Sequence, residues 1–242
     1  MKKVSLLSLL TVLAISTTAG AHTENPFYMP AEGKGYSKTT IEMGDQLKGV
    51  EDSTLTVRET LGYGITDRLS VDGSIEYLMD SYIGDSWDKE DGLGQFNLGL
   101  KYRYLTGSML GDAYINYGTS MDEDVFYKNN TYTIGTKFGV RHSDYEVAGV
   151  VEYRFVDTDW DDFNQFAVGV DSMYKFNKTW SANLSLNYEM LDDLYGEDYD
   201  DPLFLKPQVN LTTSAGTVSA YYKTDVMGDH EDSFGVKYGV QF

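Results

Sequence analysis

Apolar and polar residues alternate along most of the chain after residue 36. The last ten residues show this most clearly, because Phe234, Val236, Tyr238, Val240 and Phe242 are apolar and small or polar residues stand between them. A period of two predicts a β-strand with one apolar and one polar face. Most of the alternating segments are long enough for a tilted membrane-spanning strand of roughly ten residues. We count twelve of them, at 37–44, 54–65, 68–79, 94–105, 111–120, 131–141, 145–156, 163–176, 179–191, 203–212, 217–226 and 233–242.

The connections between these segments alternate in length. Even-numbered segments are followed by tight connections such as Asn177-Lys178, whereas odd-numbered ones are mostly followed by long acidic connections. Short periplasmic turns and long outer loops on an even number of strands are typical of a bacterial outer-membrane barrel. The sequence therefore predicts an all-β fold, an antiparallel up-and-down transmembrane β-barrel of twelve strands over residues 37–242. The long acidic connections include 80–91, 121–130, 157–162, 192–201 and 227–232.

The final strand resembles the C-terminal signature of Gram-negative outer-membrane β-barrel proteins. That signature combines a terminal Phe, here Phe242, with the alternating apolar residues Phe234, Val236, Tyr238 and Val240. The resemblance implies insertion by the barrel assembly machinery and residence in the outer membrane. An edge strand of a soluble domain is the alternative interpretation.

The first 21 residues read as a cleaved signal peptide. They combine Met1-Lys2-Lys3, an apolar run from Val4 to Ile15 and a small-residue cleavage site before His22. Residues 22–36 contain two Pro and no period, so we expect a periplasmic N-terminal segment, either a free tail or a stretch tucked into the barrel mouth.

The chain has no Cys, so it contains no disulfide framework, and its net charge of −19 argues against nucleic acid as a partner.

Phe242 fixes the lipid-facing side of the last strand, and the alternation carries this assignment back through the chain. Almost no charge falls on that face. Glu59 is the exception, which predicts either a bulge or a wrong strand assignment there. Pro207 lies inside another predicted strand, where a paired backbone N–H would be expected.

The opposite face carries charges of both signs and should line the lumen. The cations from segments two, four and six could form one basic wall with acidic residues between them, and such walls set ion selectivity. The basic residues are Lys38, Arg58, Lys101, Arg103, Lys137, Arg141, Arg154, Lys175, Lys206, Lys223 and Lys237. The acidic residues are Glu42, Asp72, Glu76, Asp112, Glu146, Glu152, Asp171, Glu189 and Asp225.

Two functions fit this lumen. Twelve strands fall between barrels that side chains fill and barrels that hold a wide aqueous channel, so a narrow porin-like channel for small hydrophilic or charged solutes is one hypothesis. The other is a plugged structural or surface-interaction barrel, because buried charges are normally paired. The architecture is similar to that of the twelve-stranded oligogalacturonate and sialic-acid porins, which implies a narrow channel with basic tracks on its wall.

The outer loops carry most of the excess negative charge. We expect them to act as an electrostatic filter that favours cations, facing the phosphates of lipopolysaccharide. Clustered carboxylates could also bind divalent cations weakly, although the Asp-x-Asp start at Asp157 lacks the Gly and the final acid of a calcium loop. The loop carboxylates are Asp157, Asp159, Asp161, Asp192, Asp193, Glu197, Asp198 and Asp200.

Hydrolase chemistry is a weaker alternative. Asp229-His230 with Asp157 and Asp159 resembles the acid–base pairs of omptin proteases only in residue type and location. His142-Ser143 resembles the pair of outer-membrane phospholipase A, but it falls in a predicted periplasmic turn. We therefore predict no enzymatic activity and no cofactor.

Overall fold

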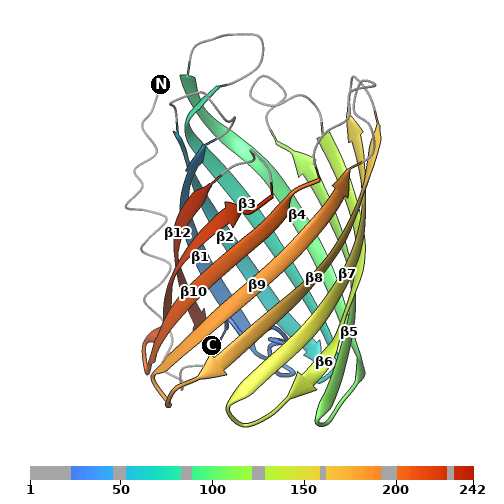
Figure 1. Ribbon diagram of the computed structural model, residues 1–242, viewed down its shortest axis with the longest axis vertical. Helices are drawn as coiled ribbons and strands as arrows, with labels where there is room; N and C mark the ends of the chain where they lie inside the picture. The colour runs from blue at the N-terminus through green and yellow to red at the C-terminus, as the bar shows by residue number, and fades with distance from the viewer. Residues whose placement is uncertain are drawn as a thin grey trace.

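The structure is a computed structural model that describes residues 23–45, 53–82, 89–121, 129–158, 162–191, 201–227 and 232–242. In these residues twelve strands form one closed antiparallel barrel in which β1 pairs with β12, as Figure 1 shows. This confirms the predicted fold class and strand number. The strands are β1 (Gly35–Asp45), β2 (Ser53–Thr66), β3 (Leu69–Tyr82), β4 (Lys89–Leu105), β5 (Met109–Ser120), β6 (Asn129–Arg141), β7 (Tyr145–Thr158), β8 (Phe163–Lys175), β9 (Trp180–Leu191), β10 (Leu203–Thr213), β11 (Gly216–Asp225) and β12 (Ser233–Gln241).

The tight connections all lie at one end of the barrel, the lower end in Figure 1, which we call the short-turn end. Their sequences satisfy the turns locally. Between β8 and β9, the side-chain oxygen of Asn177 accepts hydrogen bonds from the backbone N–H groups of Thr179 and Trp180, both at 2.8 Å. Between β10 and β11, Gly216 has a φ of 141°, which suits glycine and strains most other residues. Within the described residues, no helix is long and apolar enough to cross a membrane.

The two walls of the barrel divide as the alternation predicts. Side chains such as Leu98, Ile134 and Leu184 point outward and are about half exposed, and they form an apolar outer surface. The last strand follows the same pattern, since Phe234, Val236 and Phe242 are exposed on the outer wall. Predicted lumen residues such as Asp112 and Glu146 lie on the inner wall and are buried, since successive side chains of a strand alternate between its two faces.

Glu59 does lie on the outer wall, and neither predicted explanation is right. Strand β2 is present, and its pairing with β1 runs without a register shift, with Glu59 opposite Thr39. The Glu59 carboxylate instead accepts hydrogen bonds from Ser37 Oγ at 2.5 Å and from Thr39 Oγ1 at 2.6 Å, both on the same face of β1. Two hydroxyl donors therefore replace part of the hydration that a lipid-facing carboxylate would lose.

Pro207 is accommodated by a gap in one ladder. It pairs with Leu184 of β9, but the pairing of β10 with β11 is interrupted at Lys206 and Pro207 and resumes at Gln208 in the same register. The missing N–H of Pro207 thus costs pairing on one side only. Most predicted strand boundaries shift by one to three residues. The largest shift is at β4, which begins at Lys89 instead of residue 94, so the backbone of Asp91, expected in a loop, belongs to a strand.

Candidate functional site in the barrel lumen

Charged residues on the inner wall pair mainly with neighbours on the wall. Arg103 of β4 pairs with Asp112 of β5, and Arg141 of β6 pairs with Glu146 of β7. In both pairs the two residues are register partners on adjacent strands. Arg58 of β2 and Glu76 of β3 are also register partners and form an ion pair. The acidic residues therefore do interleave with the basic ones, as the sequence suggested.

The two ion pairs at the short-turn end have buried carboxylates. Arg103 Nε and Nη2 donate to the two carboxylate oxygens of Asp112 at 2.7 and 2.9 Å, and the Asp112 side chain is 1% exposed. Arg141 Nε and Nη2 donate to Glu146 at 2.7 and 3.3 Å, and the Glu146 side chain is also 1% exposed. Paired N–H donors match the geometry of a carboxylate and fix the arginine in place.

Pairs farther along the strands are more open. Lys137 Nζ lies 2.7 Å from Asp171 Oδ2, and both side chains are about a quarter exposed. Arg154 Nη2 lies 2.6 Å from Glu152 of the same strand, whose other oxygen accepts a bond of 2.8 Å from Tyr114. The strands in these pairs are at most two apart, so the described pairs follow the wall instead of crossing the lumen.

Three lysines contact aromatic rings. Lys206 and Lys237 lie 5.2 and 4.8 Å from the ring centre of Tyr221, and the Tyr221 hydroxyl donates to Glu42. Lys223 lies 3.7 Å from the ring centre of Phe204. Cations over ring faces are attracted by the ring quadrupole.

The other predicted lumen residues have varied surroundings. Asp72 lies beside Gly99, where a side chain would meet its carboxylate. Glu189 accepts hydrogen bonds from Asn187 at 2.7 Å and from Gln165. Asp225 accepts backbone N–H groups of Leu203 and Met227 at the end opposite the short turns. Lys175 is the last residue of β8.

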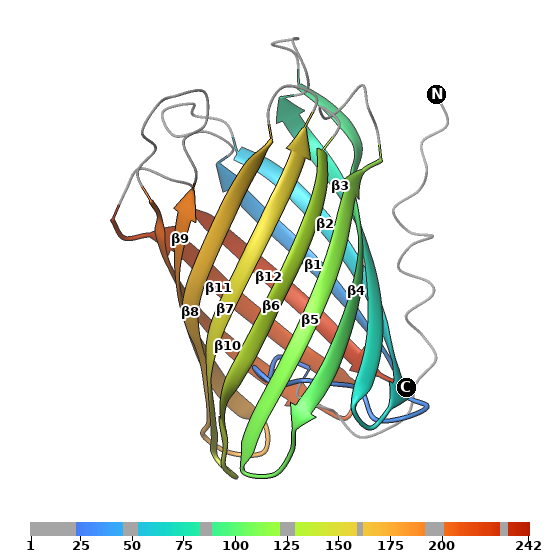
Figure 2. The ribbon, with the colours of Figure 1, turned by 90° about the vertical axis from the view of Figure 1, so that its right-hand side faces the viewer.

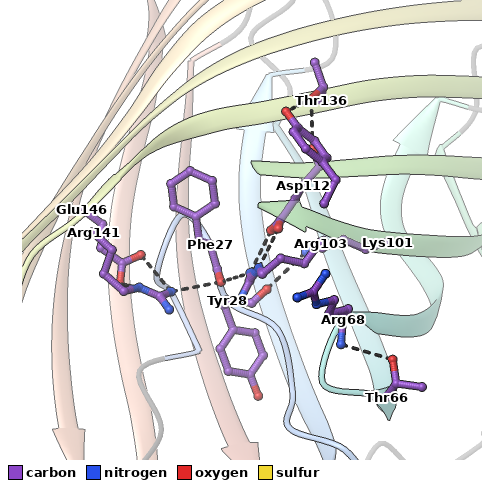
Figure 3. A network of polar contacts seen from close by, with 11 residues as sticks. Phe27, Tyr28, Thr66, Arg68, Lys101, Arg103, Asp112, Thr136, Arg141 and Glu146 are labelled. Atoms are coloured by element: carbon purple, nitrogen blue, oxygen red, sulfur yellow. Dashed lines mark hydrogen bonds and ion pairs between the residues drawn. The ribbon is translucent and has the colours of Figure 1, made fainter. Parts of the chain in front are cut away.

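Residues 23–34, which we call the N-terminal segment, lie at the short-turn end, with residues 23–30 inside the barrel and residues 31–34 exposed. Figure 2 shows the segment in blue crossing the interior near the lower end. Its backbone oxygens are bound by wall residues: Arg103 Nη2 and Arg141 Nη2 donate to Phe27 O at 2.6 and 3.2 Å, and Lys101 Nζ donates to Tyr28 O at 3.3 Å, as Figure 3 shows for this network. These contacts hold the segment in the mouth of the barrel.

Phe27 anchors the segment by apolar packing. Its side chain is 0% exposed and forms one cluster with Leu110 of β5 and Ala148 of β7, which point into the lumen. Sequence reasoning missed these contacts, although two apolar residues on a polar face were a signal. Burial also raises the pKa of the neighbouring Tyr28 hydroxyl to about 12.

Glu24 anchors the segment by charge. Its carboxylate accepts hydrogen bonds from Gln208 Nε2 at 2.9 Å and Lys237 Nζ at 3.0 Å, and Lys38 Nζ lies 4.0 Å away. Asn183 Nδ2 donates to the Glu24 backbone oxygen at 2.7 Å. Burial alone would raise the Glu24 pKa, but the two ammonium groups and the amide donor outweigh it and lower the pKa to about 2.

The segment is also tied to the wall by its backbone. Glu32 forms a parallel bridge with Gly64, Gly33 N donates to Gly64 O, and Gly64 N donates to Lys34 O, both at 2.9 Å. A side chain at Gly64 would collide with the Ala31 carbonyl oxygen, so glycine permits this close approach.

Most outer-loop predictions fall outside the described residues: Asp159, Asp161, Asp192, Asp193, Glu197, Asp198, Asp200, Asp229 and His230. Asp157, at the end of β7, accepts a hydrogen bond of 3.4 Å from Asn130. In the part of the chain that the structure describes, no group of three potential ligands could hold a metal ion.

His142 and Ser143 lie in the turn between β6 and β7 at the short-turn end. Ser143 Oγ is 3.1 Å from His142 Nδ1, and both residues are exposed. The His142 ring stacks on Tyr145 with 5.1 Å between ring centres. The pair therefore occupies an exposed turn, as expected from the sequence.

Solved structures share this architecture at low sequence identity. A KdgM porin in complex with disordered oligogalacturonate is similar with a TM-score of 0.55 and 10% identity, over 86% of this chain and 98% of that one. The fold is that of an outer-membrane β-barrel. The translocator domain of the autotransporter NalP from Neisseria meningitidis is similar with a TM-score of 0.53 and 12% identity, over 86% and 87% of the two chains. No protein-family model and no curated protein matches the sequence.

Proposed function

We propose that the protein is an outer-membrane porin-like channel that passes small hydrophilic solutes by passive diffusion. The observation that carries this proposal is that the ion pairs between described strands join strands at most two apart. The pairs therefore leave charges on the wall of the lumen without connecting strands on opposite sides. Charged walls at close quarters select among ions and solutes. The similarity to a KdgM porin supports the same function, and we propose no enzymatic role.

In this proposal the short-turn end faces the periplasm. Residues 1–21 direct export and are cleaved, the barrel assembly machinery inserts the chain, and the acidic loops face lipopolysaccharide, where they could hold divalent cations weakly. The loops then favour cations at the entrance. Neutralising Asp157 and the acids of 192–200 to Asn and Gln should lower cation-over-anion selectivity, measured as a reversal potential under a salt gradient.

The experiment that tests the channel is single-channel recording of the refolded protein in planar bilayers, with uptake of neutral and charged sugars by proteoliposomes. We expect discrete unitary currents that are absent with the heat-unfolded protein. If neither the wild type nor any variant that releases the N-terminal segment conducts at any voltage, the channel is excluded.

A plugged structural barrel remains the second candidate, because one observation favours it. The N-terminal segment contacts the wall on several sides of the lumen, with Phe27 fully buried. A barrel that never opens would conduct in no variant, whereas a closed channel conducts once the segment is released.

A further inference from the structure

The N-terminal segment spans the lumen from one wall to the opposite one. Phe27 O is bound by Arg103 of β4 and Arg141 of β6, and the Glu24 carboxylate is bound by Gln208 of β10 and Lys237 of β12. In the order of the closed barrel, β4 lies opposite β10 and β6 lies opposite β12. A stretch of chain this short can reach both walls only by running straight across the interior.

The wall around Glu24 is organised as a carboxylate site. Lys237 Nζ donates to Gln208 Oε1 at 3.0 Å, which turns the Gln208 amide so that its N–H₂ group points to Glu24 and to Asn210 Oδ1 at 2.7 Å. Lys237 Nζ also lies over the ring of Tyr221, 4.8 Å from its centre. The contacts among Lys237, Gln208, Asn210 and Tyr221 do not involve the segment, so this part of the site would persist if Glu24 left it.

The two ends of the segment are held in different ways. Glu32, Gly33 and Lys34 are held by backbone pairing with Gly64, next to β1. Residues 23–31 are held by wall side chains instead, through the Phe27 packing, the Glu24 charge contacts and the hydrogen bonds that wall residues donate to the backbone oxygens of Glu24, Phe27 and Tyr28. Gly33 has a φ of 73°, a conformation that glycine adopts freely, and it lies within the paired part, two residues after residue 31.

We propose that residues 23–31 are an internal gate of the channel, latched by Glu24 in a carboxylate-binding site of the lumen wall formed by Lys38, Lys237 and Gln208. The inference rests on the proposed channel function. In the latched state the segment obstructs the lumen at the short-turn end. A small carboxylate in solution competes with Glu24 for the same donors and favours the open state.

A disulfide tests whether the segment is the obstruction. A Cβ built on Gly239 of β12 lies 3.3 Å from Thr23 Cβ, close to the separation of about 3.5–4.5 Å in disulfides. The chain has no Cys, so the double variant Thr23→Cys/Gly239→Cys can form only this intramolecular bond. We expect the oxidised protein to carry at most a tenth of the current of the reduced protein, and the single variants to be insensitive to reductant.

Charge variants test the latch. Glu24→Ala should increase the open fraction roughly tenfold, whereas Glu32→Ala, which removes an exposed carboxylate of the same segment, should not change it. At constant ionic strength, replacing chloride by propionate, which reproduces the Glu side chain, should open the wild type. It should have no effect on Glu24→Ala, whose gate is already released.

The outcomes separate the gate from the channel. If oxidised and reduced double variants conduct equally, the segment does not obstruct the ion path and the gate is wrong while the channel stands. If Glu24→Ala and Glu32→Ala behave alike, or propionate acts as chloride does, Glu24 is not the latch. If no variant conducts, the gate and the channel are both wrong.

Discussion

The acidic residues of the ion pairs are more buried at the short-turn end of the lumen than in its middle. At the short-turn end, Asp112 and Glu146 are almost fully enclosed, and each is held by an arginine that also donates to Phe27 O. Half-way along the strands, pairs such as Arg58–Glu76 are partly exposed, with 43% of the Arg58 side chain accessible. One lumen therefore contains both a closed polar core and an open charged wall.

The difference teaches which charges are structural and which are available to solutes. Removing one partner of a buried ion pair leaves an uncompensated charge, whereas a partly exposed partner is rehydrated. The basic residues at the short-turn end are thus used to hold the barrel and the segment together. The charged residues farther along the wall are accessible to solutes in the lumen.

Arg103→Ala should give the largest effect in this comparison. It leaves Asp112 buried without its partner, so we expect the free energy of unfolding to fall by about 3–5 kcal/mol in urea titrations of the protein in lipid vesicles. Arg58→Ala is the matched control and should cost about 1 kcal/mol or less. Equal losses in the two variants would show that the two regions do not differ in burial as described.

Phe27→Ala should release the segment without unfolding the barrel. Deleting a fully buried Phe costs about 3–5 kcal/mol in a closed core, but here the segment can leave the wall, so the loss is limited to its docking. We expect proteolytic cleavage between residues 23 and 31 to accelerate at least roughly tenfold, since about 1.4 kcal/mol corresponds to a factor of ten. The urea midpoint of the barrel should stay unchanged.

Tyr28→Phe is the control for that experiment. The Tyr28 hydroxyl is buried without a hydrogen-bond partner in the described part of the chain, so its removal should leave cleavage at the wild-type rate. If Phe27→Ala lowers the urea midpoint of the barrel as well as accelerating cleavage, the segment and the strands unfold as one cooperative unit.

The pH dependence of docking should follow Glu24. Its pKa is lowered from 4.5 to about 2 in the folded protein, so its contribution to docking is fully present above pH 4.5 and is lost as the pH falls through 2. Pepsin, which is active in this range, should cut the segment several-fold faster at pH 2 than at pH 4. In Glu24→Gln the ratio should be near one, and a wild-type transition at pH 4 to 5 would contradict the ion contacts.

Glu59→Leu should give the smallest effect, on the outer wall. Replacing a carboxylate in an apolar surface by a side chain of similar size is often stabilising, and the freed Ser37 and Thr39 hydroxyls can bond to nearby backbone carbonyls. We expect the free energy of unfolding in vesicles to rise by about 1 kcal/mol. A decrease of that size would show that the hydroxyl–carboxylate cluster stabilises the β1–β2 ladder.

The barrel could be predicted because its signal is repeated in every strand. The period of two and the alternating connection lengths define strand number, faces and the ends of the barrel, and small errors such as the start of β4 do not disturb them. Glu59 was misread because the hydroxyls that bond to its carboxylate belong to Ser37 and Thr39. These residues lie on the neighbouring strand and are far from Glu59 in the sequence.

The N-terminal segment could not be placed from sequence. Residues 23–34 have no period, and their partners come from strands throughout the chain, such as Arg103, Asn183 and Lys237. In the sequence, Leu110 and Ala148 only interrupt a polar face, and their packing against Phe27 appears only in the structure. Contacts of this kind depend on three-dimensional proximity that only the closed barrel creates.

The seam between the first and last strands sets the order of assembly. Gly35 and Phe242 exchange backbone hydrogen bonds of 2.8 and 2.9 Å, and the segment ends directly before Gly35. This ladder joins the two most distant parts of the chain, so its loop closure costs the most entropy and we expect it to form late. The segment directly precedes Gly35, so its last residues are fixed at the rim of the lumen only when this seam has formed. Late closure of the barrel thus sets the earliest moment at which the segment can dock across the finished lumen.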